Sequence, residues 1–183
     1  IRVSQGVAGF QTSRIGVIAS QLLSQNVITI LTIDSLIHPT PRSGIPGLPD
    51  SFTVTDLPSL SILTRGIVET YLALFYVAVQ PIAAIEREFR LLWWDWHGVN
   101  ERIWSLSRIG SKAKKLETYE KRRNDLRSKI AEHSNYSSLP PKLRKQFEQR
   151  RSPTDAVLLS KVKLAEAAGI HPDQFKVTYT SLS

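Results

Sequence analysis

Hydrophobic residues recur at helical spacing along almost the whole chain. Apolar positions three and four apart predict a first helix over residues 12–36, a second over 57–80 and a third over 82–109. The third has the most regular pattern, with apolar residues at Ile82, Ile85, Phe89, Leu92, Trp96, Val99, Ile103 and Leu106. No segment shows the alternation typical of a strand. The pattern therefore predicts an all-α fold.

Proline and glycine mark the ends of these helices. Residues 38–55 contain four Pro and two Gly and are predicted to form a loop. Asp56 with Pro58 is typical of a helix start, because Asp caps the first turn and Pro fits within it. The helix over 57–80 is apolar on both sides, which predicts a buried helix. Pro81 leaves only a tight connection, so helices 57–80 and 82–109 are expected to form an antiparallel core hairpin.

The rest of the chain, from residue 111, also predicts helices. Residues 111–134 are highly charged, with only a narrow apolar stripe, and a short basic helix follows that ends near Arg151. A helix over 153–168 closed by Gly169 and a last helix from Pro172 complete the pattern. We expect a bundle of five to seven helices in a single domain, 1–183, with a basic helical arm over 111–151.

The composition limits the chemistry. A chain of 183 residues with 42% hydrophobic residues can bury one ordinary core. The absence of Cys excludes disulfides and thiolate metal sites, and the four His show no metal-ligand spacing, so neither a metal nor a cofactor is expected. The chain also lacks Met, which indicates either an internal fragment or a sequence from which methionines were lost.

The longest run without a charged residue lies between Arg14 and Asp34. It is long enough to span a bilayer, but it contains more Ser, Thr, Gln and Asn than hydrocarbon tolerates. We interpret it as a helix of a soluble protein. No secretory signal pattern is present, so the expectation is a cytoplasmic protein without membrane contact.

The net charge of +8 comes from one segment. Residues 112–151 contain 13 Lys or Arg against 5 Asp or Glu, and the rest of the chain contains 11 of each. Basic side chains here could bind the phosphates of RNA or DNA, and Tyr119, Tyr136 and Phe147 could stack on bases. The alternative is a solvated helix whose charges pair with their neighbours. The candidate nucleic-acid-binding residues are Lys121, Arg122, Arg123, Arg127, Lys142, Arg144 and Lys145.

Two charged residues interrupt the apolar helix over 57–80. Arg65 and Glu69 are four residues apart and therefore lie on the same helical face. Burial of one such charge alone would cost several kcal/mol, about 3–5, so each needs a partner. The pair is either a structural ion pair or the lining of a polar cavity in the bundle.

A second stripe runs beside the apolar seam of the helix over 82–109. It is formed by Glu86, Arg90, Trp93, His97, Asn100 and Trp104. Arg90 and His97 lie two turns apart, and this Arg-x6-His spacing resembles the signature of the HEPN superfamily of helical nucleases and toxins. The resemblance implies RNA cleavage without a metal, in which His97 moves the proton of the ribose 2′-hydroxyl and Arg90 holds the phosphate.

Three further segments carry a broader resemblance. Residues 60–71 (LSILTRGIVETY), 86–90 (EREFR) and 175–183 (FKVTYTSLS) resemble a bacterial helical family, domain of unknown function 5677. The resemblance implies an all-helical fold. It also implies that the chain is truncated at its C-terminal end, because members continue past the final Ser. The residues that would share one polar centre are Arg65, Glu69, Glu86, Arg90 and Tyr179.

Two functions follow from these observations. The favoured one is a non-catalytic helical interaction or oligomerisation module, with buried charges that fix the packing and a homo-oligomer as a candidate assembly. The alternative is a HEPN-like, metal-independent endoribonuclease of a toxin or phage-defence type, which acts on nucleic acid through the basic arm. His97 distinguishes the two, because the polar network does not need it.

Overall fold

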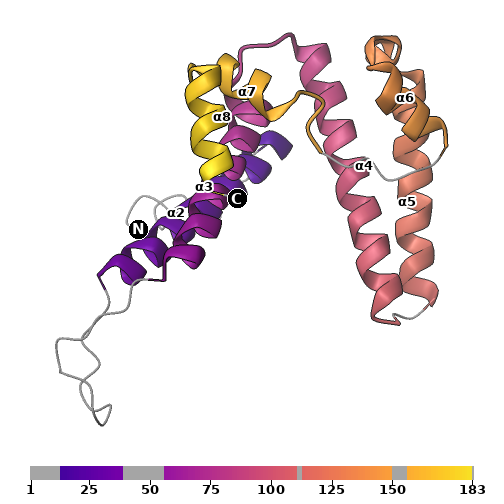
Figure 1. Cartoon of the computed structure of the whole chain (residues 1–183). Helices are drawn as coiled ribbons and strands as arrows, with labels where there is room; N and C mark the ends of the chain where they lie inside the picture. The colour runs from indigo at the N-terminus through magenta and orange to yellow at the C-terminus, as the bar shows by residue number, and fades with distance from the viewer. Residues whose placement is uncertain (1–12, 39–55, 111–112, 150–155, 183) are drawn as a thin grey trace. The chain divides into compact units, whose positions relative to one another are not determined.

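The computed structural model describes residues 13–38, 56–110, 113–149 and 156–182 (Figure 1). All regular structure within these residues is helical, which confirms the predicted all-α fold. A π-helical segment, Phe75–Val79, and a 3-10 segment, Ser134–Ser138, accompany the α-helices. The α-helices are α2 (Arg14–Ile37), α3 (Leu57–Leu74), α4 (Ala84–Arg108), α5 (Ala113–Glu132), α6 (Pro141–Glu148), α7 (Lys161–Ala167) and α8 (Pro172–Ser181). The predicted loop lies outside the described residues from position 39 to 55.

The contacts divide the chain into two compact units, where length and composition predicted a single domain. The first unit comprises residues 1–80 and 161–183, and the second comprises residues 81–160. The first unit is therefore built from two segments that are separated in sequence by the whole of the second.

In the first unit, α2 packs along α3, while α7 packs on α8 and also contacts α3. The predicted start of α3 is confirmed, because the Asp56 carboxylate accepts a hydrogen bond from the Ser59 amide at 3.1 Å. Ser13 caps α2 in the same way, by accepting from the Gly16 amide at 3.2 Å. Gly169 follows α7 with a positive φ of 82°, a backbone conformation that glycine adopts without strain.

In the second unit, α4 and α5 pack side by side as a helical pair, and α6 covers one end of it. The apolar seam predicted for α4 supplies much of the core, and Trp93, Trp96 and Phe147 contact one another with ring centroids 4.9–6.1 Å apart. Such aromatic contacts contribute beyond their buried area. The buried core residues are Phe89, Leu92, Trp93, Trp96, Val99, Leu126, Ile130, Leu139 and Phe147.

The prediction of a core hairpin between residues 57–80 and 82–109 differs from the pairing that the structure shows. α3 takes α2 as its main neighbour, and α4 takes α5. The physical reason lies in the apolar faces. The apolar face of α3 is matched by α2, whereas the seam of α4 is matched by Leu126 and Ile130 of α5.

The prediction that the helix over 57–80 is buried on all sides is also wrong. Leu72 is the one buried residue of α3, and Tyr76 and Val77 are buried in the π-helical segment that follows. Ile62 is 69% exposed. The described part of the first unit supplies neighbours for two sides of α3 only, so its remaining apolar side chains stay at the surface.

The helix predicted over 153–168 is shorter in the structure. Residues 153–155 lie outside the described residues, and α7 begins only at Lys161. Residues 156–160 are not helical, and Leu158 packs against the core of the second unit. A side chain held in that core explains why the helix starts after it.

Two described helical segments, Arg14–Ile37 and Leu57–Val79, are long and apolar enough to cross a membrane. Length and composition alone give this result, and the core helix of a soluble protein meets the same criteria. The expectation of a protein without membrane contact therefore stays a prediction.

We expect Ile130→Ala to lower the free energy of unfolding of the second unit by about 2–5 kcal/mol, because it leaves a cavity in a packed core. Ile130 is 0% exposed. All four Trp of the chain lie on α4, so Trp fluorescence during urea unfolding reports on this unit. Ile109→Ala is the matched control, because Ile109 is 76% exposed, and its effect should stay within about 0.5 kcal/mol.

Candidate polar site on the first unit

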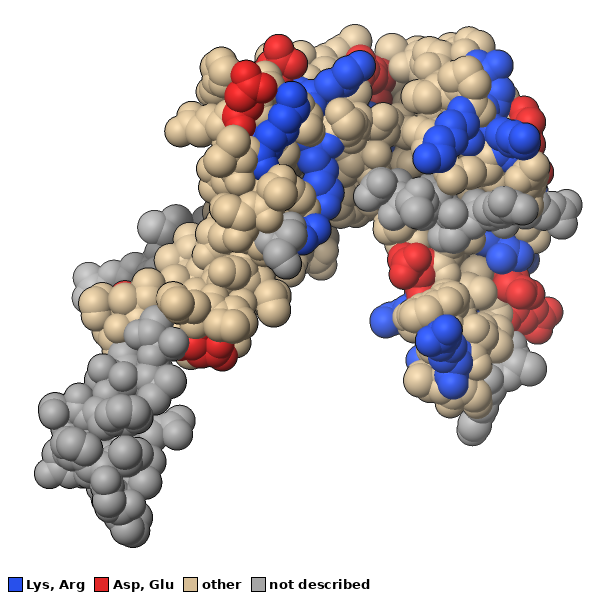
Figure 2. Space-filling view, viewed as in Figure 1, with Lys and Arg blue, Asp and Glu red and all other residues tan. Residues whose placement is uncertain are grey.

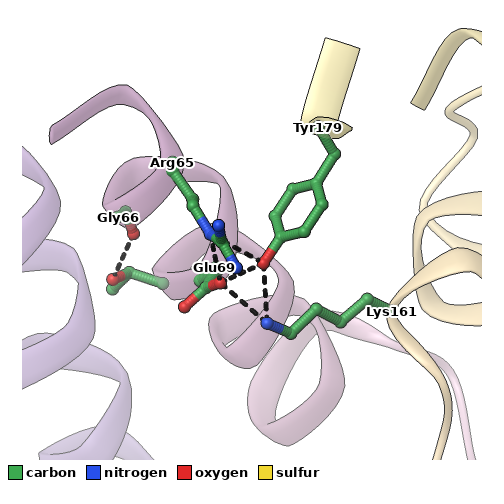
Figure 3. Close-up of polar contacts among 6 residues, drawn as sticks. Arg65, Gly66, Glu69, Lys161 and Tyr179 are labelled. Atoms are coloured by element: carbon green, nitrogen blue, oxygen red, sulfur yellow. Dashed lines mark hydrogen bonds and ion pairs between the residues drawn. The ribbon is translucent and has the colours of Figure 1, made fainter. Parts of the chain in front are cut away.

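One carboxylate oxygen of Glu69 gathers the polar side chains of the first unit (Figure 3). Glu69 Oε1 accepts hydrogen bonds from Lys161 Nζ at 2.7 Å, from Arg65 Nε at 3.3 Å and from the Tyr179 hydroxyl. The hydroxyl of Tyr179 also accepts, from Arg65 Nε at 3.1 Å and from Lys161 Nζ at 2.7 Å. The cluster thus joins α3 to the first residue of α7 and to α8.

The charges of this cluster stabilise one another. Burial raises the pKa of Glu69, but hydrogen bonds from Lys161, Tyr179 and Arg65 outweigh it and hold that pKa at about 2. Burial lowers the pKa of Lys161, and its hydrogen bonds to Glu69 and Tyr179 reverse the direction and raise it. The side chains of Arg65 and Glu69 are 38% and 40% exposed, so the cluster lies at the surface and not in a dry cavity.

The ring of Tyr179 adds a second layer of contacts. The Arg65 guanidinium lies 4.7 Å and the Lys161 ammonium 5.1 Å from the ring centroid, within the range of cation–π interaction. Phe175, one turn earlier on α8, stacks on the same ring at 5.2 Å. The ring is therefore positioned by α8 itself, and the arrangement favours a structural clamp between helices.

The structure brings together three of the five residues expected to share one polar centre. Arg65, Glu69 and Tyr179 meet, while Glu86 and Arg90 belong to the second unit and pair with each other. Glu86 Oε1 accepts from Arg90 Nε at 3.0 Å and from Arg90 Nη2 at 2.5 Å. The predicted Arg, Glu, Glu, Arg network is therefore found as two separate i, i+4 pairs.

Lys161 is the member of the cluster that sequence reasoning missed. It lies 92 residues from Glu69 in the chain and follows an apolar run with no motif around it. A lysine at the start of a helix looks in the sequence like any solvated lysine. Electrostatics gives no signal either, because Arg65 and Glu69 together carry no net charge and so do not call for a further cation.

The two candidate catalytic residues lie on α4. Arg90 is buried, with only 6% of its side chain exposed, and Glu86 takes up its guanidinium. His97 is partly buried two turns further on, between buried residues Trp96 and Val99. The structure thus places the pair on one helix, as predicted, but the side chain that would hold a phosphate is bonded to a carboxylate.

The basic segment is partly built into the second unit. Arg127 donates to the Glu148 carbonyl at 3.2 Å and lies over the Phe147 ring, and Arg144 donates to the carbonyls of Ser137 and Leu139. Phe147 is 2% exposed, so it does not present a face to a base. Tyr119 and Tyr136 pack against the same core and are half-buried.

The remaining basic candidates are mostly at the surface. Lys121, Arg122, Lys142 and Lys145 are exposed, and Arg123 is partly buried. Arg122 pairs with Asp95 across a hollow of about 400 Å³ between α4 and α5. Arg102 on the same hollow lowers the pKa of Tyr119 through a hydrogen bond. Binding of RNA or DNA by this segment stays a prediction.

Among the described residues, no group of three or more His, Asp or Glu side chains could hold a metal ion. Comparison of the chain with known protein families, with curated proteins and with solved structures finds no match. The two family resemblances of the sequence therefore stay predictions.

We expect acid to weaken the first unit through Glu69. Its pKa of about 2 in the folded protein lies below the ordinary 4.5, so the unfolded chain takes up the proton more readily. The stabilisation is complete above pH 4.5 and is lost as the pH falls towards 2. Because the carboxylate is 40% exposed, we expect a loss of about 1 kcal/mol.

The measurement is urea unfolding followed by the NMR signals of Phe175 and Tyr179. It is repeated at several pH values between roughly 6 and 2, because this range covers the titration of such a carboxylate. Glu69→Gln should remove most of this pH dependence. Glu88→Gln, at an exposed carboxylate of α4, is the matched control and should leave it unchanged. Equal acid sensitivity in all three proteins would show that Glu69 does not hold the clamp.

Proposed function

We propose that this chain is a non-catalytic helical oligomerisation module that associates with further copies of itself through the outer face of α2. The outer face is the side of α2 turned away from α3. The observation that carries the proposal is the exposure of its apolar side chains. The apolar side chains that lie on this side of α2 and are more than 40% exposed are Val17, Val27, Ile28 and Leu31.

Most of α2 is uncharged, and almost none of it is buried within the single chain. Asn26 is the one buried residue among the 24 of α2, although most of the helix is uncharged. Contiguous apolar patches on soluble proteins mark sites of interaction. Figure 2 shows that the part of α2 and α3 that faces the viewer is predominantly tan, with few charged side chains.

A protein surface is favoured over a bilayer as the neighbour of the packed pair α2 and α3. The second apolar segment, Leu57–Val79, carries Arg65 and Glu69 near its middle, and both bond to side chains of α7 and α8. Charged residues at the centre of a bilayer are costly, at about 2.5–3.5 kcal/mol each even on insertion scales. Helix α7, whose Lys161 bonds to Glu69, carries three charged residues among its seven, Lys161, Lys163 and Glu166.

A structural role is favoured over catalysis for the charged residues. The Glu69 cluster joins three helices, and Arg90 is buried and bonded to Glu86. An RNase reading needs Arg90 to release this carboxylate and reach a phosphate. The oligomerisation hypothesis requires no change in the Glu69 cluster or in the Arg90–Glu86 pair.

We expect the protein to sediment as an oligomer at micromolar concentration. Ile28→Asp should raise the dissociation constant of this oligomer at least about tenfold, because burial of a carboxylate in an apolar interface costs more than about 1.4 kcal/mol. Ile28 is 64% exposed, so the substitution leaves the monomer folded. Ile109→Asp is the matched control at an isolated exposed isoleucine and should leave the oligomer intact.

Circular dichroism checks that both variants remain helical. A wild-type protein that stays monomeric at every concentration overturns the proposal. Flotation of the wild type with lipid vesicles, lost in Ile28→Asp, would replace it with a membrane-binding role.

A further inference from the structure

The outer face of α2 has an internal symmetry. Residues Val17, Ser24, Ile28 and Leu31 recur at helical spacing and share one side of the helix. On the opposite side, which packs towards α3, Asn26 is only 8% exposed. The outer face is therefore a stripe that runs most of the length of a helix of about 36 Å.

The charges of α2 are arranged symmetrically about Ser24. Arg14 lies ten residues before it and Asp34 ten residues after it, and no charged residue lies between them. A second copy laid antiparallel with Ser24 facing Ser24 therefore brings each Arg14 close to the other copy's Asp34. Parallel packing would instead place like charges together at both ends.

The same antiparallel register places each large apolar side chain of the stripe opposite another apolar side chain or a small one. Residues whose numbers add to 48 then face each other, so Val17 meets Leu31 and Ile28 meets Ser20. Val17, Ile28 and Leu31 are 44%, 64% and 53% exposed in the single chain. The Ser20 hydroxyl already donates to the Val17 carbonyl at 2.9 Å, so its burial in the interface leaves that hydroxyl paired.

We propose that two copies of this chain form a two-fold symmetric dimer through antiparallel α2 helices whose axis passes at Ser24. The inference rests on the proposed oligomerisation and adds to it the partner, the orientation and the register. The net charge of +8 comes from residues 112–151, so two copies repel each other through that segment, whereas the rest of the chain has no net charge and does not contribute to the repulsion. An uncharged stripe with opposite charges at its two ends is the place where a basic chain associates with itself. A two-fold contact uses the same face of both copies and is therefore closed, so assembly through it stops at the dimer.

Cysteine cross-linking tests the register, because the chain contains no Cys of its own. A disulfide forms only when the two Cβ atoms approach to about 3.5–4.5 Å. Under mild oxidation, Ser24→Cys alone should give a covalent dimer. Val17→Cys alone and Leu31→Cys alone should not, but a mixture of these two variants should.

Ser107→Cys, at an exposed serine of α4, is the control for random collisions. The proposal is overturned if Ser24→Cys cross-links no more than Ser107→Cys, and a parallel dimer replaces it if Val17→Cys cross-links with itself. If the oligomer that Ile28→Asp disrupts persists while this cross-linking pattern fails, the oligomerisation module stands and the antiparallel arrangement falls.

A charge swap supplies an independent readout. Arg14→Glu should raise the dissociation constant on the order of tenfold, because two attractive pairs per dimer become repulsive. Adding Asp34→Arg should restore it, since the double variant has both pairs in reversed sense. Restoration at low salt that disappears at 1 M salt supports the paired ends, as the Debye length is then about 3 Å. A double variant weaker than either single variant contradicts them.

Discussion

The first unit depends on a single carboxylate oxygen. Glu69 Oε1 accepts from donors on α3, α7 and α8, and the last two helices come from a segment more than 80 residues further along the chain. The apolar contacts between α2 and α3 would hold without it, but the attachment of α7 to α3 rests on few other contacts. An acceptor that serves three donors explains why the apolar helix tolerates charges near its middle.

The second unit is held by different physics. Its core is aromatic, with Trp93 and Trp96 almost wholly buried against Phe147, and its basic residues contribute at the edge. Arg127 lies over Phe147 and Arg144 over Tyr136, so two cations that look solvated in the sequence cover aromatic faces. Some of the basic side chains of this unit therefore contribute to its packing, and only the others are exposed at the surface.

Local signals in the sequence predicted the helices, but the sequence carries no comparable signal for which helices pack against each other. The cap at Asp56 and the seam of α4 are decided within a few residues, and both are found where the pattern indicates. The apolar residues on both sides of α3 fit several neighbours equally well, so the choice of α2 over α4 needs the structure. Arg65 and Glu69 were found by their spacing, whereas Lys161 was missed because its partner is 92 residues away.

The divided first unit has a consequence for the order of events on the ribosome. The second unit is continuous in sequence and can complete its core while α7 and α8 are still unsynthesised. Until they emerge, the Glu69 carboxylate lacks two of its three donors, and the hairpin of α2 and α3 stays apolar and uncovered. Nascent chains in this state are prone to aggregate. Closure of the first unit therefore joins two segments across the whole of the second unit, and it bears the entropy cost of closing so long a separation last.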